Sequence, residues 1–358
     1  MINNYYVPIL KWKRGEQIAI RLLDTNSKHK LLPLIEIPPV KYSWSYKKTK
    51  RTLEPYINGV VNSIYTSFGS RRVFLDLVNI YQEGLLSNGE HPIENIVNQG
   101  SKYELTIVPV VKENSDKDYV KAIQNLLKNK VINEICIRIE KCDFKVVNNT
   151  INNILKLYSI SSAQGHIVID LKEKTIDDCS TYEVLMPALI NNLVDLYNWE
   201  TITLTVTSFP MTLEKVSRNS YKLLPRIEFN LWKNIYNNPQ LQRKIQFGDY
   251  CISNPQYIDI DPKKIKINAN IRYTISDYYL VCKGIDIKMY GLGQMFDLCS
   301  WLINSGYYLG QSYCWGDRYI YDVVNNNKST GSPEIWHRVG TNHHIQFVVN
   351  ELSDLFYF

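Results

Sequence analysis

The sequence predicts a (β/α)8 barrel of the TIM type with a C-terminal α+β elaboration. Eight short runs rich in β-branched residues recur along residues 1–254, and each is nearly continuously apolar, as strands covered on both faces should be. Helix-like stretches separate them, and this alternation is typical of βαβ units in a parallel sheet. The strand count favours a closed barrel. The alternative is an open doubly wound parallel sheet, which usually has a glycine-rich first turn, whereas residues 11–17 contain one glycine.

The predicted strands share a β-branched, apolar composition. They are residues 5–11, 32–37, 72–78, 105–112, 134–140, 166–172, 201–208 and 245–250. Three of the intervening stretches, residues 115–130, 144–158 and 182–197, place apolar side chains at a spacing of three and four, which predicts amphipathic helices. Ser115 is the candidate N-cap of the first of these helices.

After the last of these strands the pattern changes, and an antiparallel hairpin is predicted instead of a further βα repeat. Residues 264–276 and 277–288 are expected to form its strands, with a turn near Ser276–Asp277. A helix-like segment over residues 293–305 follows, and a last helix ends the chain. We therefore predict that residues 255–358 form an extension that docks on the barrel.

Composition and charge are those of an ordinary globular protein. Of 358 residues, 45% are hydrophobic and 21% are charged, and the net charge of +6 permits contact with phosphates without demanding it. The seven cysteines are scattered without a CxxC motif, which predicts reduced thiols. The N-terminus lacks the pattern of a signal peptide, and no apolar run reaches the ~18 residues of a membrane span. We therefore expect a cytoplasmic protein without a membrane partner.

Charged side chains recur near the downstream ends of the predicted strands. They are Lys11, Glu36, Asp76, Lys112, Arg138, Glu140, Asp170 and Asp249. Charges are rarely buried without partners, so these positions suit the mouth of a barrel, where the C-terminal strand ends gather the functional sites of this fold. A structural interpretation stands beside this one. Each charge could mark where the chain leaves the core, or the set could form a salt-bridge network that plugs the barrel.

Two kinds of role are predicted for this ring. The candidate catalytic residues are Glu36, Asp76, Asp170 and Lys11. The carboxylates could pair as acid and base or hold Mg²⁺ or a similar divalent cation, and a buried lysine could form a Schiff base. The candidate substrate-binding residues are Lys112, Arg138 and Asp249. The chain lacks HExxH, Walker and GxSxG motifs, which disfavours the reactions that depend on them.

A second unusual pattern lies near the C-terminus, in CWGDRYIYDVV and EIWHRVGTNHHIQFVV. The first predicts a tight turn that opens a helix capped by Asp317. The second predicts a helix capped by Thr341 or Asn342, whose first turn holds two adjacent histidines at the positive end of the helix dipole.

His343 is the candidate general base of this region. The candidate substrate-binding residues here are Trp315, Asp317, Arg338, Asn342 and His344. Adjacent helical residues point about 100° apart, so one metal ion shared by the two histidines is disfavoured. In the structural interpretation Asn342 caps the helix, one histidine bonds a carbonyl group, and the tryptophans pack the extension onto the barrel.

The opening YVPILKWKRGEQIAI, the following PLIEIPP and the closing WGDRYI…WHRVGTNHHIQFV resemble the phage and bacterial Beta protein family, over nearly the whole chain. Members of this family look like accessory genes of phages and bacterial mobile elements. The resemblance therefore implies a role in phage–host conflict. It brings no established catalytic mechanism and assigns no role to any matching residue.

Three functions remain open at this stage. The first is a barrel hydrolase or phosphodiesterase that acts on a phosphate-bearing substrate, such as a nucleotide or nucleic acid, in antiviral defence. The second is a non-catalytic sensing or binding module for a phage or operon-encoded partner protein, with an aromatic interface. The aromatic residues concerned are Tyr307, Tyr308, Tyr313, Trp315, Tyr319 and Tyr321. The third is a nucleic-acid binder without catalysis that uses the basic segment 41–51.

Overall fold

The computed structural model describes most of the chain. The described residues are 6–40, 42–43, 48–49, 53–140, 146–257, 266–326 and 328–356. The basic segment 41–51 lies outside them, apart from the short antiparallel strands β3 (Tyr42–Ser43) and β4 (Lys48–Thr49). The nucleic-acid contact expected of that segment therefore stays a prediction.

The chain folds into two compact units, each assembled from several segments. The barrel unit contains Met1–Trp12, Leu31–Val206 and Leu231–Asp249, and the second unit contains Lys13–Lys30, Thr207–Asn230 and Tyr250–Phe358. A single boundary after residue 254 therefore does not describe the division. The helix in Lys13–Lys30 packs against the last helix of the chain, and the strand in Thr207–Asn230 pairs with the C-terminal hairpin.

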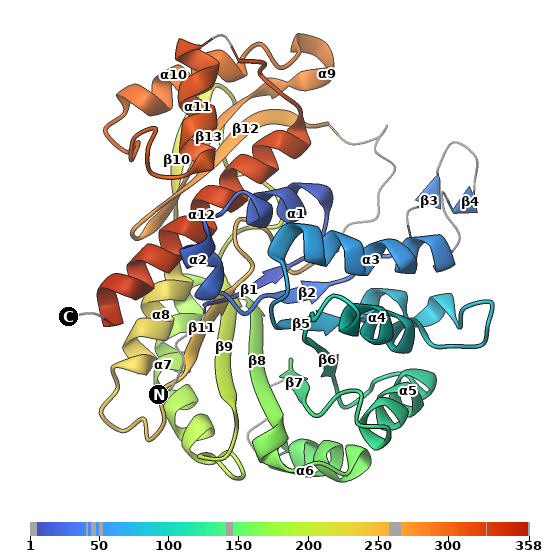
Figure 1. The fold of residues 1–358 in the computed structure, drawn as a ribbon. Coiled ribbons are helices and arrows are strands. Elements are labelled where there is room, and N and C mark those ends of the chain that lie inside the picture. The colour runs from blue at the N-terminus through green and yellow to red at the C-terminus, as the bar shows by residue number, and fades with distance from the viewer. Residues whose placement is uncertain are drawn as a thin grey trace. The chain divides into compact units, whose positions relative to one another are not determined.

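Eight parallel strands close the barrel in the order β1-β11-β9-β8-β7-β6-β5-β2 (Figure 1). They are β1 (Tyr6–Leu10), β2 (Leu34–Glu36), β5 (Val73–Asp76), β6 (Ile107–Val111), β7 (Ile135–Ile139), β8 (Gly165–Glu173), β9 (Thr201–Thr207) and β11 (Gln246–Asp249). Each corresponds to one of the eight predicted runs. The predicted barrel is confirmed, and the open-sheet alternative is wrong because β1 pairs with both β2 and β11.

Helices connect the strands of the barrel. They are α3 (Leu53–Phe68), α4 (Pro92–Ser101), α5 (Lys117–Lys128), α6 (Val147–Tyr158), α7 (Ile176–Asn191) and α8 (Ile227–Tyr236), with the 3₁₀ turns η1 (Val78–Glu83) and η2 (Ser162–Gln164). The N-cap of α5 is Asp116, whose carboxylate accepts from the N–H groups of Asp118 and Tyr119. The prediction of Ser115 is therefore wrong by one residue. The Ser115 hydroxyl instead accepts from the backbone N–H of Lys112 at the end of β6.

An antiparallel sheet with the strand order β10-β13-β12 organises the second unit. Its strands are β10 (Ser220–Pro225), β12 (Asn268–Ile275) and β13 (Tyr278–Asp286). The predicted hairpin is confirmed, with Ser276 and Asp277 between its strands. Sequence reasoning missed β10 because most of its side chains are exposed or only half-buried, so no apolar pattern marks it.

Six helices of the second unit lie within the described residues. They are α1 (Arg14–Arg21), α2 (Thr25–His29), α9 (Ile287–Tyr290), α10 (Met295–Asn304), α11 (Trp315–Asn325) and α12 (Pro333–Phe356). An apolar core forms where α10, α11 and α12 cover one face of the sheet, with Ile271, Leu280 and Ile320 fully or almost fully buried. Among the described helices, none combines the length and the apolarity needed to cross a membrane.

Candidate functional site

The side chain of Arg138 lies at the centre of a charged cluster inside the barrel unit. Its Nη1 donates to Glu36 Oε1 at 2.8 Å and to Asp76 Oδ2 at 2.7 Å, while its Nη2 donates to Asp170 Oδ2 at 2.7 Å. Arg138 belongs to β7, whereas Glu36 belongs to β2, three places away in the strand order. A contact over that separation has to pass through the interior of the barrel, so the predicted convergence of these four residues is observed.

The two innermost carboxylates are held by backbone groups as well as by cations. Asp76 Oδ1 accepts from the N–H of Val78, and Asp170 Oδ1 accepts from the N–H of Lys172. Neither side chain has exposed surface. Charge-assisted bonds of this kind offset the cost of removing a carboxylate from water, so both groups are fixed in place.

Two lysines lie between these buried carboxylates and a more exposed one. Lys112 Nζ lies 3.4 Å from Asp76 Oδ2, and Lys172 Nζ lies 2.9 Å from Asp170 Oδ2. Both ammonium groups also reach Glu140 Oε1, at 2.6 Å and 3.0 Å. Partial burial acts to raise the pKa of Glu140, but Lys172, Lys112 and Arg138 together lower it to about 2. Glu140 is therefore ionised at neutral pH.

Lys11 lies on the inner face of the barrel. The register pairs Ile9 with Leu34, and two further residues along each strand bring Lys11 level with Glu36. The side chain of Lys11 is buried. Together these residues form what we call the rim cluster. Its members are Lys11, Glu36, Asp76, Lys112, Arg138, Glu140, Asp170 and Lys172.

Asp249 does not face the inside of the barrel as predicted. It shares a face of β11 with Phe247, whose ring packs against Trp232 of α8 on the outside. Its Oδ1 accepts from the hydroxyl of Tyr6 at 2.5 Å. Gly248 takes the inner position instead, and a Cβ atom there would collide with the side chain of Thr205. The alternation of a strand thus turns Asp249 outward even though it ends a barrel strand.

The carboxylates of the rim cluster do not suit the predicted Mg²⁺ ion. Glu36, Asp76 and Asp170 all accept from the same guanidinium, which occupies the position between them. A cation that bridged these carboxylates would have to displace Arg138, which has no exposed side-chain surface. The arrangement therefore favours chemistry that uses the protein's own cations.

The second unit contains a separate polar cluster around His343. Its Nδ1 lies 2.8 Å from Asp317 Oδ2, and its Nε2 lies 2.8 Å from the carbonyl oxygen of Thr274. Asp317 also accepts from the Tyr273 hydroxyl at 2.6 Å and from the Cys314 thiol. Burial acts to raise the pKa of Asp317, but His343 and these donors lower it overall. Both ring nitrogens of His343 lie against oxygen atoms of the protein, so neither nitrogen is directed toward a substrate.

The helix that carries the adjacent histidines begins earlier than predicted. α12 starts at Pro333, so Thr341 and Asn342 are interior residues, and the histidines lie far from the positive end of the helix dipole. The predicted helix start is wrong because α12 continues through Gly340, a residue whose lack of a side chain serves packing. A Cβ atom at Gly340 would lie 2.7 Å from the carbonyl oxygen of Arg272, so glycine permits α12 to approach β12 closely.

The other C-terminal candidates also bond within the second unit. Asn342 accepts from the N–H of Gly316 and donates to the carbonyl oxygen of Ala19, so it joins α11, α12 and α1. Asp317 is the third residue of α11 and not its N-cap, which is Cys314. The half-buried Trp315 packs on the apolar core, and the guanidinium of Arg338 lies over its ring.

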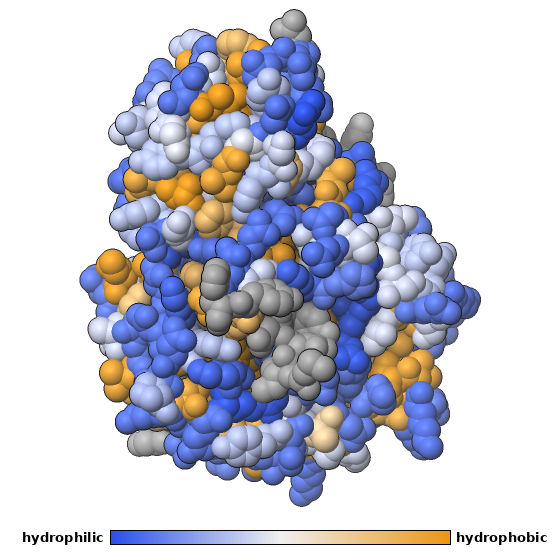
Figure 2. All heavy atoms as spheres, turned by 60° about the vertical axis from the view of Figure 1, so that its left-hand side comes forward, coloured by the Kyte–Doolittle hydropathy of each residue, from blue (hydrophilic) through white to orange (hydrophobic). Residues whose placement is uncertain are grey.

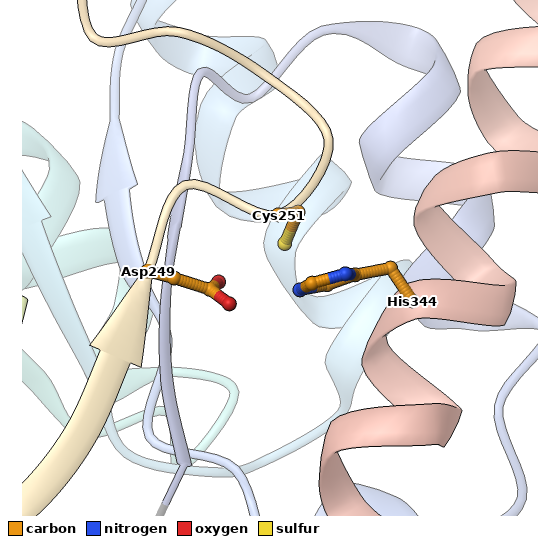
Figure 3. A group of neighbouring side chains, drawn as sticks. All are labelled: Asp249, Cys251 and His344. Atoms are coloured by element: carbon orange, nitrogen blue, oxygen red, sulfur yellow. The ribbon is translucent and has the colours of Figure 1, made fainter. Parts of the chain in front are cut away.

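His344 and Cys251 approach each other within the second unit (Figure 3). The imidazole Nδ1 of His344 lies 2.8 Å from the hydroxyl of Thr274, and its ring is fully buried. Figure 3 also shows Asp249 at the end of β11, in the barrel unit. A zinc site needs three or four protein ligands, and Cys251 and His344 supply two of them.

Most of the six aromatic residues predicted as an interface are turned toward the core. Tyr319 is buried, and Tyr307, Tyr308 and Trp315 pack against the apolar core of the second unit. The hydroxyl of Tyr308 donates to the carbonyl oxygen of Asp317. These side chains therefore stabilise the second unit, and its exposed aromatic surface comes from other residues.

A model of the family described as Beta protein matches residues 6–350. The chain belongs to the Beta protein family. The match confirms the resemblance inferred from the opening and closing segments of the sequence. A search of curated proteins finds no match.

Solved structures similar to this Beta protein family member are distant. One is described as a mandelate racemase/muconate lactonizing enzyme from Sorangium cellulosum, with 9% identity, a TM-score of 0.34 and coverage of 70% of this chain and 54% of that one. A mandelate racemase/muconate lactonizing protein from Herpetosiphon aurantiacus has 8% identity, a TM-score of 0.33 and coverage of 78% and 63%. The chain thus spans less than two thirds of either protein.

A third similar structure is the N-terminal domain of a protein described as an aldolase from Bacteroides vulgatus. It has 10% identity, a TM-score of 0.35 and coverage of 99% of this chain and 97% of that one. Similarity at this level carries no functional argument. The barrel of the Beta protein family member rests on its own strand pairing.

Sequence reasoning missed Lys172 and the two residues that donate to Asp317 in the His343 cluster, Tyr273 and Cys314. Lys172 ends the same predicted strand as Asp170, and this spacing of two residues was the signal that could have found it. Tyr273 and Cys314 gave no comparable signal, because each lies in an apolar or aromatic segment typical of a core.

Proposed function

We propose that this member of the Beta protein family is an accessory protein of phage–host conflict in which the rim cluster binds and hydrolyses a phosphate-bearing substrate. A nucleotide or a nucleic acid with a phosphodiester bond is the substrate class. The family resemblance to genes of phages and mobile elements supports the antiviral setting. The six described cysteines form no disulfide, which supports a cytoplasmic location.

One observation carries the proposal. Two ammonium groups, those of Lys112 and Lys172, converge with Arg138 on a single point at the C-terminal ends of the barrel strands. Lys172 keeps about a third of its side-chain surface exposed, so the point is open to solvent on that side. A convergent set of cations at this end of a barrel suits a phosphate group, whose charge they would stabilise.

Glu36 is the proposed general base. Of the three carboxylates that accept hydrogen bonds from Arg138, Glu36 alone keeps some exposed side-chain surface, so it is the one that can reach a water molecule. In the reaction the water oxygen adds to phosphorus and the ester P–O bond breaks. Glu36 accepts the proton from the water, and the leaving oxygen takes a proton from solvent.

The experiment is a turnover assay over linear and cyclic nucleotides and single- and double-stranded nucleic acids. We expect a slow hydrolysis without added metal, reduced by a factor of about 100 or more in Glu36→Gln, with binding of the same substrate retained. Glu113→Gln, at an exposed position after β6, is the control. Absence of turnover across the whole panel would refute the hydrolase.

The second unit favours an alternative, a non-catalytic module that binds a phage or operon-encoded partner protein. Tyr221 is 54% exposed and stacks on Trp301 with ring centroids 4.0 Å apart, at the edge of a pocket of about 720 Å³. Met289, Tyr290 and Phe296 are exposed as well. On the face drawn in Figure 2, apolar residues form several patches among hydrophilic ones.

Aromatic and methionine side chains of this kind are favoured in protein interfaces. Co-purification of a partner that is lost in Tyr221→Ser and retained in Glu36→Gln would select the binding module. Loss of the partner in Glu36→Gln alone would argue against it.

A further inference from the structure

The carboxylate of Glu140 occupies the position at which the cations of the rim cluster converge. Its Oε1 lies 2.6 Å from Lys112 Nζ, 3.0 Å from Lys172 Nζ and 3.6 Å from Arg138 Nε. A single oxygen atom that receives two ammonium groups and faces a guanidinium is in the environment of a bound anion. Glu140 supplies this oxygen from the residue that directly follows β7.

The partners of the two lysines differ in how firmly they are held. Each lysine contacts one carboxylate without exposed surface, Asp76 or Asp170, and shares Glu140, whose side chain is 34% exposed. The buried partners keep the ammonium groups in position when Glu140 leaves. Glu140 is therefore the carboxylate that can be exchanged. Water can replace it as a partner of the two lysines, whereas water cannot reach the contacts of the lysines with Asp76 and Asp170.

The backbone conformation of Lys172 also indicates an ordered binding site. Its φ is +60°, a left-handed conformation that costs a lysine free energy and is tolerated where the surrounding structure requires it. In this conformation the Lys172 N–H bonds Asp170 Oδ1 while its ammonium group reaches Asp170 Oδ2 and Glu140. One residue thereby fixes the buried carboxylate and presents a cation to the exposed one.

The charge balance of the rim cluster indicates that its ligand is negatively charged. The rim cluster contains four cations and four carboxylates, so it is formally neutral while Glu140 is in place. Without Glu140 it carries one positive charge and presents two ammonium groups with an unfilled position between them. An anion with oxygen atoms restores the neutral state.

We propose that Glu140 is an internal substitute for the substrate's phosphate group, and that it swings out when a phosphate monoester or diester binds between Lys112 and Lys172. This inference rests on the proposed function for the identity of the site and adds a regulatory contact to it. The protein closes its own anion site with a carboxylate, so only ligands that compete with Glu140 gain entry. The affinity for a single phosphate is therefore weak in the wild type and rises when the competitor is removed.

The test is binding of inorganic phosphate, measured by isothermal titration calorimetry at fixed ionic strength. We expect Glu140→Gln to bind phosphate about tenfold more tightly than the wild type, and Glu113→Gln, which changes the net charge equally from an exposed position, to differ less than twofold. The further change Lys172→Gln in the Glu140→Gln protein should abolish the gain. Because Glu140 is partly exposed, its replacement leaves the fold intact, which circular dichroism checks.

Equal affinities of Glu140→Gln and Glu113→Gln would overturn the proposal, and so would absence of phosphate binding in all variants. These outcomes are separate from those of the hydrolase assay. Tighter phosphate binding in Glu140→Gln without any turnover refutes hydrolysis and retains the anion site. Turnover by the wild type with no effect of Glu140→Gln on phosphate affinity retains hydrolysis and refutes the substitution.

Discussion

The rim cluster of the barrel unit and the His343 cluster of the second unit are built from the same materials and differ in their access to solvent. Each places a buried basic side chain against carboxylate oxygen atoms: Arg138 contacts Asp76 in one cluster, and His343 contacts Asp317 in the other. In the rim cluster, Glu140 and Lys172 remain about a third exposed, whereas His343 and Asp317 have no exposed side-chain surface. A charged side chain can bind a ligand only where the ligand can replace one of its present hydrogen-bond partners or a water molecule.

The same difference explains why the strand-end charges form a partly exposed site and the C-terminal motifs form a buried one. The strand-end charges stay near the barrel opening, since the C-terminal ends of parallel strands leave the core together. The WGDR and GTNHH segments instead join α11 and α12 to α1 and β12 within the second unit, through Asn342, Gly316 and Gly340. Unusual residues in both segments are explained by close packing, so their distinctiveness in the sequence does not indicate catalysis.

The largest effect is expected for Arg138→Met. The change leaves three carboxylates without their shared counter-ion in the barrel interior, and two of them have no exposed surface. Removing one partner of a buried ion pair costs about 3 to 5 kcal/mol, a large part of the stability of a typical domain. Urea unfolding followed by circular dichroism measures the loss.

The matched control for this change is Arg318→Met. Arg318 forms an exposed i,i+4 pair with Asp322, so its replacement should cost less than about 1 kcal/mol. Similar losses for Arg318→Met and Arg138→Met would show that the rim cluster is not held by Arg138, and the contrast between the two clusters would lose its basis.

A smaller effect, about 3 kcal/mol, is expected for Asp317→Asn. The amide keeps the shape of the carboxylate but removes the charge that faces Nδ1 of His343. Urea unfolding followed by circular dichroism measures the loss, and the ¹⁵N chemical shifts of the His343 ring report the change in its contact with residue 317. Asp297→Asn, at an exposed position of α10, is the control.

An unfolding free energy unchanged by Asp317→Asn would contradict a stabilising contact between Asp317 and His343. It would also free His343 from the structural role inferred above and restore it as a candidate base.

The barrel could be predicted from the sequence because its signal is local and repeated. Each strand is a short apolar run, and its last charged residue marks the opening, as Glu36, Asp76 and Asp170 show. Asp249 follows the same local rule and still points outward, because the side on which a strand residue lies depends on the register with its neighbours, which no single strand reveals.

The second unit could not be predicted to the same extent because its contacts are long-range. Segments around residues 13–30 and 207–230 join the C-terminal hairpin across a large separation in sequence, and neither carries a pattern that announces this partner. The helix start predicted at Thr341 or Asn342 was wrong for a similar reason, because Gly340 is accommodated inside α12 by a contact with another element. The carbonyl group of Arg272 that makes glycine necessary lies in another element.

The stabilities of the two units should respond differently to mild acid. His91, the buried N-cap of α4 in the barrel unit, accepts from the N–H of Ile93 with an unprotonated Nδ1. Burial is the main cause that lowers its pKa from 6.5 to about 4. Between these values the unfolded chain binds the proton and the folded barrel does not, so stability is complete above pH 6.5 and falls as the pH drops toward 4.

At pH 5 this effect amounts to about 2 kcal/mol. The pKa of Asp317 in the second unit is lowered instead from 3.8, so its contribution persists until the pH falls below that value. Hydrogen exchange corrected for the intrinsic rates at pH 7 and pH 5 should therefore show lower protection at pH 5 in α4 and its neighbours, while protection in the hairpin of the second unit is unchanged. His91→Asn retains the cap and should remove the pH dependence, whereas the exposed His29→Asn should not. An equal loss of hydrogen-exchange protection in both units at pH 5 would mean that a group other than His91 controls the acid response.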